Sequence, residues 1–146
     1  MSTEMHATDV KGLVEHLQQA LNGHDIEAYL ACFHETYASD QPAHPARSFR
    51  GREQVRKNWT AIFDGVPDFQ AEVLRWAAAV DMVWIEWRWY GTRIDGSAFD
   101  MRGITLWRVE AGRRVWGRLY MELVDPTGEG VDTMISAMTE GQRCEP

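Results

Sequence analysis

The chain has 146 residues, of which 45% are apolar and 25% charged, and its formal net charge is −7. This length predicts one domain, residues 1–146, with a core of its own. An excess of 22 acidic over 15 basic side chains argues against nucleic acid or an anionic membrane as a partner. No stretch approaches the roughly 18 consecutive apolar residues of a membrane-spanning helix.

Other features of the composition narrow the class of protein. Seven tryptophans are unusual for this length and indicate an apolar cavity, a broad interface or both. The two cysteines, Cys32 and Cys144, match no disulfide or metal spacing, so a reducing compartment is expected. Polar and charged residues interrupt residues 1–22 throughout, unlike a signal peptide. We therefore predict a cytoplasmic protein without a metal or another cofactor.

Helices are predicted in the first half of the chain. Between residues 10 and 21 the apolar side chains have the spacing of one helical face, and Asn22-Gly23 supplies a stop. Asp25 is expected to cap a short second helix with Ile26, Tyr29, Leu30 and Phe33 on one side. A short strand is predicted at 37–40, and a third helix from about 52 to 63.

Strands are predicted in the second half. After residue 67 the apolar period changes from about 3.6 residues to 2, which indicates strands at 69–80, 82–93, 98–109 and 115–124. Short turns such as Asp95-Gly96 join them, so an antiparallel meander is expected. An amphipathic stretch at 131–138 predicts a C-terminal helix, with Met134 and Met138 as ordinary core residues. An adaptable lid or a partner contact, formed with Met121, is the alternative. Helices followed by a meander indicate an α+β fold, with the helices on one sheet face.

The strand at 82–93 has two different faces. One is wholly apolar and should meet the helices: Val83, Ile85, Trp87 and Trp89. The other mixes aromatic and charged side chains, as wet protein interfaces do: Trp84, Glu86, Arg88 and Tyr90. We predict a homodimer through this outer face. A solvated face with scattered aromatic residues is the alternative.

Short strings in the chain resemble the SnoaL-like family, whose superfamily includes ketosteroid isomerase, limonene-epoxide hydrolase and nuclear transport factor 2. The strings are, in order, Arg50-Gly51-Arg52-Glu53, Val66-Pro67-Asp68-Phe69, Tyr90-Gly91-Thr92 and Trp107-Arg108-Val109-Glu110-Ala111-Gly112-Arg113. The resemblance implies a cone-shaped, curved, antiparallel or mixed sheet wrapped by N-terminal helices. Its core would span about 8–125, with a helical tail at about 128–140. Members use the cone pocket for isomerisation, hydrolysis, cyclisation or binding, so the fold alone does not assign a function.

The last predicted strand carries the first catalytic candidates. The family's hydrolases have a Trp-Arg-x-Tyr-x-Asp pattern here, and Glu122 stands where their catalytic Asp would be. The resemblance implies that the row of Trp116, Arg118, Tyr120 and Glu122 faces the cavity or its rim. Glu122 would be a general acid or base, Tyr120 an oxyanion donor, and Arg118 a partner for the carboxylate or an acidic substrate. A structural Arg–Glu pair on the outer face is the alternative.

Asp40 is the second carboxylate candidate. Ketosteroid isomerase has its proton-moving Asp directly before a proline, whereas Ser39-Asp40-Gln41-Pro42 places it one residue earlier. The related hydrolase has a polar residue two before its proline, which fits Asp40 better. Capping of the turn before the proline is the alternative. Thr105 stands where the isomerase has its oxyanion-hole Asp, so ketosteroid isomerisation in its familiar form is not expected.

These features predict a pocket for a small apolar molecule, cyclic or aromatic. Its expected lining comes from several predicted elements: Trp59, Trp87, Trp107, Thr105, Arg118, Tyr37 and His44. Asp40, Glu122 and Tyr120 would support cofactor-free isomerisation, cyclisation, dehydration or hydrolysis. The alternative is a non-catalytic ligand-binding or dimeric assembly module. Carboxylates converging in a closed cavity would favour the enzyme, whereas a cavity filled with tryptophan rings would favour the module.

Overall fold

Three helices precede most of the sheet in the computed structural model, which describes residues 7–141. They are α1 (Ala7–Asn22), α2 (Ile26–Leu30) and α3 (Arg52–Gly65). All three are predicted, but α2 ends before Phe33, which the sequence places on this helix and the structure places at the start of a strand. The apolar spacing of α1 does place one face in the core: Val10, Val14, Leu17, Ala20 and Leu21 are buried. The predicted cap of α2 is confirmed, because the Asp25 carboxylate accepts a hydrogen bond from the Ala28 N–H at 3.0 Å.

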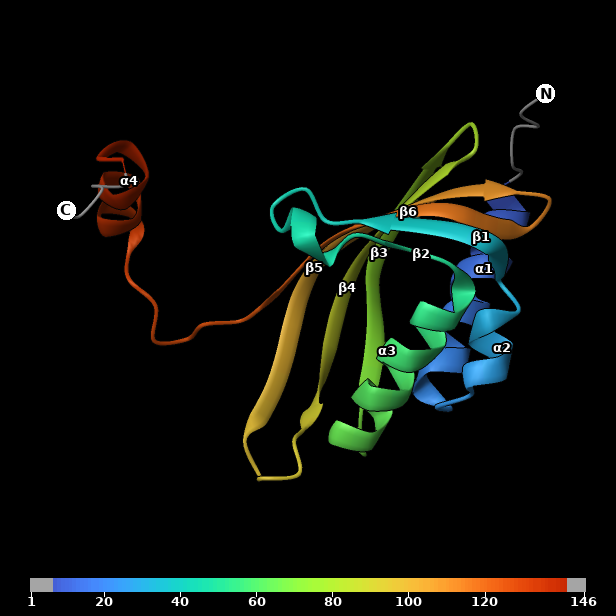
Figure 1. Cartoon of the computed structure of the whole chain (residues 1–146), viewed down its shortest axis with the longest axis horizontal. Coiled ribbons are helices and arrows are strands. Elements are labelled where there is room, and N and C mark those ends of the chain that lie inside the picture. Colours follow the sequence, from blue (N-terminus) through green and yellow to red (C-terminus); the bar gives the residue numbers. More distant parts are fainter. Residues whose placement is uncertain (1–6, 142–146) are drawn as a thin grey trace.

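Six strands form one mixed sheet in the order β2-β1-β6-β5-β4-β3 (Figure 1). Their bounds are β1 Phe33–Asp40, β2 Phe49–Arg50, β3 Gln70–Ala79, β4 Met82–Thr92, β5 Ala98–Glu110 and β6 Arg113–Leu123. The predicted antiparallel meander is confirmed for β3 to β6. β1 pairs in parallel with β6, and the short 3-10 helix η1 (Pro45–Arg47) lies between β1 and β2.

β1 begins earlier than the sequence predicts, at Phe33 rather than residue 37. The extension comes from pairing with the start of β6, where the Arg114 N–H donates to the Cys32 carbonyl oxygen at 2.7 Å. The polar residues 34–36 between Phe33 and Tyr37 hide this strand from an alternation pattern.

The core lies between the helices and the inner face of the sheet. The row of β4 predicted to meet the helices is buried, at 0 to 5% exposed: Val83, Ile85, Trp87 and Trp89. The opposite row is only half-buried. α1, α2 and α3 all lie on one side of the strongly curved sheet, so the other side of the sheet is its outer face (Figure 1).

The predicted C-terminal helix is confirmed as α4 (Val131–Thr139), but it stands apart from the body at the end of an extended linker (Figure 1). The prediction that Met134 and Met138 belong to the core is wrong, because they are 44% and 69% exposed. An amphipathic pattern predicts a helix without specifying what covers it. None of the helices described between residues 7 and 141 combines the length and apolar character needed to cross a bilayer.

Candidate functional site

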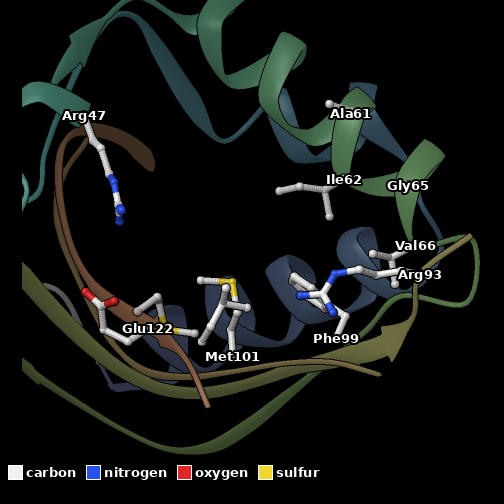
Figure 2. A pocket seen from close by; sticks show the side chains of 11 residues that line it. Arg47, Ala61, Ile62, Gly65, Val66, Arg93, Phe99, Met101 and Glu122 are labelled. Carbon is white, nitrogen blue, oxygen red and sulfur yellow. The ribbon is translucent and has the colours of Figure 1, made fainter. Parts of the chain in front are cut away.

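A pocket of about 470 Å³ lies between α3 and the ends of β5 and β6 (Figure 2). Its walls are mainly apolar and include Ile62, Phe99, Met101, Met121 and Leu123. Charged side chains stand at its two ends: Arg47 and Glu122 at one, and Arg93 at the other (Figure 2). This combination of an apolar floor with few polar groups is typical of a small-ligand site.

The loop after α3 and the end of β4 hold one end of the pocket in place. The Ile94 N–H donates to the Gly65 carbonyl oxygen at 3.2 Å. The Thr92 N–H donates to Asp68 Oδ1 at 2.6 Å, and this hydrogen bond holds the pKa of the Asp68 carboxyl below its usual range. These contacts are made by the residues directly before and after Arg93, so they fix the backbone from which the Arg93 side chain extends.

The two arginines are held to different degrees. The Arg93 guanidinium donates to the Ala98 carbonyl oxygen and lies 5.5 Å from the centre of the Phe99 ring. Arg47, on η1, is exposed and makes one long hydrogen bond, 3.4 Å, to Gln41 Oε1. Arg47 is therefore free to turn toward a ligand, whereas Arg93 is already positioned.

Glu122 pairs with His44 at the rim of the pocket. His44 Nε2 lies 2.7 Å from Glu122 Oε1, and both side chains are partly exposed. His44 lies just before η1, so folding joins it to the end of β6. The sequence predicts a place for each residue at the pocket but does not predict that they pair.

Asp40 lies outside this pocket. It is opposite Arg118 in the parallel pairing of β1 and β6, and its carboxylate accepts two hydrogen bonds from the guanidinium, at 2.8 and 3.2 Å. Asp40 lines a separate groove beside β2 with Arg50 and Trp116. Tyr120 is 45% exposed, precedes the buried Met121 on β6 and does not line the pocket. The structure therefore does not bring Asp40, Tyr120 and Glu122 together in one closed cavity.

A family model described as a SnoaL-like domain matches residues 14–117. The chain belongs to the SnoaL-like family. No curated protein matches its sequence.

Solved SnoaL-like and related structures share this fold at low identity. A SnoaL-like protein of unknown function from Burkholderia thailandensis is 21% identical, with a TM-score of 0.66 over 84% of this chain and 99% of that one. IdmH from Streptomyces antibioticus, a proposed polyketide cyclase, is 21% identical (TM-score 0.66, 77% and 91%). A proposed SnoaL-like polyketide cyclase from a Jannaschia species is 18% identical (TM-score 0.67, 90% and 90%). At these identities the comparison concerns the fold.

Aromatic rings fill the deep part of this SnoaL-like cone. Trp59, Trp107 and Tyr37 are each at most 7% exposed, and the deep cavity that they help to line is only about 70 Å³. Trp87 and Thr105 are buried against each other, because Trp87 Nε1 donates to Thr105 Oγ1 at 2.8 Å. The predicted aromatic lining is therefore close-packed, and the larger space lies at the mouth of the cone.

Sequence reasoning missed several residues of this SnoaL-like site. Arg93 was detectable, because it comes just before the hairpin turn Asp95-Gly96 and therefore lies at an end of the sheet. Arg47 carries no comparable signal. Arg114 was also missed: it is fully buried, with its guanidinium 3.5 Å from the centre of the Phe33 ring. Within residues 7–141 no group of three His, Cys, Asp or Glu side chains could hold a metal ion.

Proposed function

We propose that this SnoaL-like protein binds a small, ring-containing apolar molecule that carries a carboxylate. The observation that supports this is the pocket of about 470 Å³, whose apolar floor lies between Arg47 and Arg93. The volume falls within the range of about 300–1,000 Å³ typical of small-ligand sites. A guanidinium recognises a carboxylate through two parallel hydrogen bonds, which gives both affinity and orientation.

The family supports a ring-containing ligand. IdmH and the Jannaschia protein are described as proposed polyketide cyclases, and a cyclase by definition forms a ring. The floor of the pocket suits such a ligand, because the flexible thioethers of Met101 and Met121 pack well against flat rings.

Binding of 2-naphthoate, measured by isothermal titration calorimetry, tests the proposal. We expect 2-naphthoate to bind at least about tenfold more tightly than neutral 2-naphthalenemethanol, because one charge-assisted hydrogen bond contributes roughly 1.5–3 kcal/mol. Arg47→Gln should remove most of this preference and leave the affinity for the alcohol unchanged. Arg50→Gln is the matched control, because Arg50 is exposed on β2 and lines the other groove. Equal affinities for the two probes, or no binding of either, would contradict the proposal.

Catalysis at the pocket rim is the second candidate function. The observation in its favour is the 2.7 Å contact between His44 and Glu122, since a carboxylate paired with a histidine can accept and return a proton. In an isomerisation or cyclisation, Glu122 would take a proton from the carbon beside a carbonyl group, and the electron pair would move to the carbonyl oxygen. This mechanism needs no cofactor and uses one of the two predicted carboxylates.

Hydrogen–deuterium exchange of 2-tetralone in D₂O, followed by NMR, tests catalysis without the natural substrate. If Glu122 acts as a base, the protein accelerates exchange at the carbon beside the carbonyl, and Glu122→Gln lowers the rate at least tenfold, as removal of a general base does. Asp40→Asn should leave the exchange rate unchanged if Asp40 only pairs with Arg118. A lower exchange rate in both variants would favour a mechanism that uses both carboxylates. Absence of any acceleration would leave the non-catalytic binding module.

A homodimer through the outer sheet face remains part of the proposal. Trp84, Arg88 and Tyr90 lie on that face, and the Arg88 guanidinium lies 4.3 Å from the centre of the Tyr90 ring. Aromatic and arginine side chains are enriched at protein interfaces. Sedimentation equilibrium at micromolar concentration checks this assembly, and a monomer throughout would count against it.

A further inference from the structure

The C-terminal arm, defined as residues 124–141, is exposed along its whole length. Four apolar side chains of α4 have the spacing of one helical face, and all are 44 to 69% exposed: Val131, Met134, Ile135 and Met138. A soluble helix with such a face is normally covered by a partner surface, because burial of apolar area stabilises it. None of the described body of the same chain covers it (Figure 1).

The arm starts at the pocket. Leu123, the last residue of β6, lines the pocket, and Val124 begins the arm. A turn follows, in which the Thr127 N–H and hydroxyl donate to Asp125 Oδ1 at 3.2 and 3.0 Å, and the Gly128 N–H donates to the Asp125 carbonyl oxygen. Beyond this turn the chain runs away from its own body (Figure 1). The pocket of the same chain is therefore left open while the apolar face of α4 is left uncovered.

The charges of the arm and the pocket are complementary. The arm has four acidic residues and no basic one: Asp125, Glu129, Asp132 and Glu140. The pocket presents Arg47 and Arg93 at its two ends, and the one carboxylate of its lining, Glu122, is paired with His44. An acidic arm whose helix α4 has an apolar face thus matches an apolar opening with an arginine at each end, and complementary charge of this kind helps to fix the orientation of docking.

We propose that the arm of one copy of this chain lies across the pocket of a second copy, and that the second copy returns the same contact. Such an exchange is self-complementary and closes as a two-fold dimer. Each pocket is then completed by the partner's α4, whose methionines form an adaptable cover over the opening. The exchange does not depend on the ligand proposed above, because it concerns only the arm and the pocket mouth.

Disulfide cross-linking between two single-cysteine variants tests the exchange. One variant carries Ala61→Cys, at an exposed position of α3 that lines the pocket, and the other carries Met134→Cys on α4. Cys144 is replaced by Ser in both. Cys32 is buried and burial raises the pKa of its thiol, so it stays unreactive. We expect the mixed full-length chains, after mild oxidation, to form a cross-linked dimer that contains one copy of each variant.

The matched control replaces Ala61→Cys with Thr60→Cys, which is exposed on the same helix but does not line the pocket. This control should cross-link at least tenfold less. Equal cross-linking of the two pairs would mean random collision and would overturn the proposal. A chain carrying both Ala61→Cys and Met134→Cys that forms only an internal disulfide, seen by intact mass, would show that the arm covers its own pocket and would also overturn it.

Discussion

Gly103→Ala is expected to lower the free energy of unfolding by about 2–4 kcal/mol, because it adds overpacking to backbone strain. Gly103 lies in the middle of β5, between Trp87 on β4 and Met121 on β6, and its φ angle is +155°. A Cβ added there would overlap the Tyr120 carbonyl oxygen and would lie 2.9 Å from the Met121 Cα. Both obstacles are backbone atoms of a paired strand, so no side-chain rotation relieves the clash.

Urea denaturation followed by tryptophan fluorescence measures the effect of Gly103→Ala. The matched control is Gly12→Ala, because Gly12 is exposed on α1 and an added Cβ meets nothing within 4 Å. In the interior of a helix, the substitution of alanine for glycine should raise the free energy of unfolding by about 1 kcal/mol. A Gly103→Ala protein as stable as the wild type would mean that β5 and β6 do not approach each other as described.

Thr105→Val is expected to lower the free energy of unfolding by about 1–3 kcal/mol, because it leaves a buried donor without an acceptor. Thr105 and Trp87 are at most 1% exposed, and the indole N–H of Trp87 donates to the threonine hydroxyl at 2.8 Å. Valine has nearly the same shape as threonine but cannot accept a hydrogen bond. Thr105→Ser is the control, since it keeps the hydroxyl and should lose about 1 kcal/mol or less through the missing methyl group.

The same variant separates a structural role of Thr105 from the ligand-binding role that the sequence predicts. If the only role of the hydroxyl is to accept the hydrogen bond from Trp87, the folded Thr105→Val protein binds 2-naphthoate with the wild-type affinity, and its free energy of unfolding is lower. If the hydroxyl binds the ligand, the affinity falls while the stability changes little. Calorimetric titration and urea denaturation of one preparation give both values.

The faces of the strands could be predicted from the sequence because their signal is local. Alternation alone identifies Val83, Ile85 and Trp87 as inward residues of β4, and all are buried. On β6 the alternation holds from Gly117 onward. On the N-terminal side of Gly117, the pairing of β5 with β6 shifts by one residue, and this shift points Arg114 toward the core. No local sequence pattern indicates such a shift.

The arrangement of the site could not be predicted, because it depends on pairings between distant parts of the chain. Asp40 meets Arg118 only through the register of β1 against β6, and a shift by one residue would turn Asp40 to the other face. His44 and Glu122 meet through the path of the loop before η1. Residue types indicate which groups can do chemistry, but long-range pairing decides which of them lie together.

The parallel pairing of β1 with β6 also bears on how the chain folds. The strands from β3 to β6 each pair with their neighbour in sequence, so they can form as soon as they are made. β1 must wait for residues such as Arg118, 78 positions after Asp40, and closing so long a loop slows folding. During synthesis β1 and its short neighbour β2 therefore leave the ribosome well before β6, the longer partner of β1, exists. The first strand to be made therefore joins the meander only after β6, the last strand of that meander, has been made.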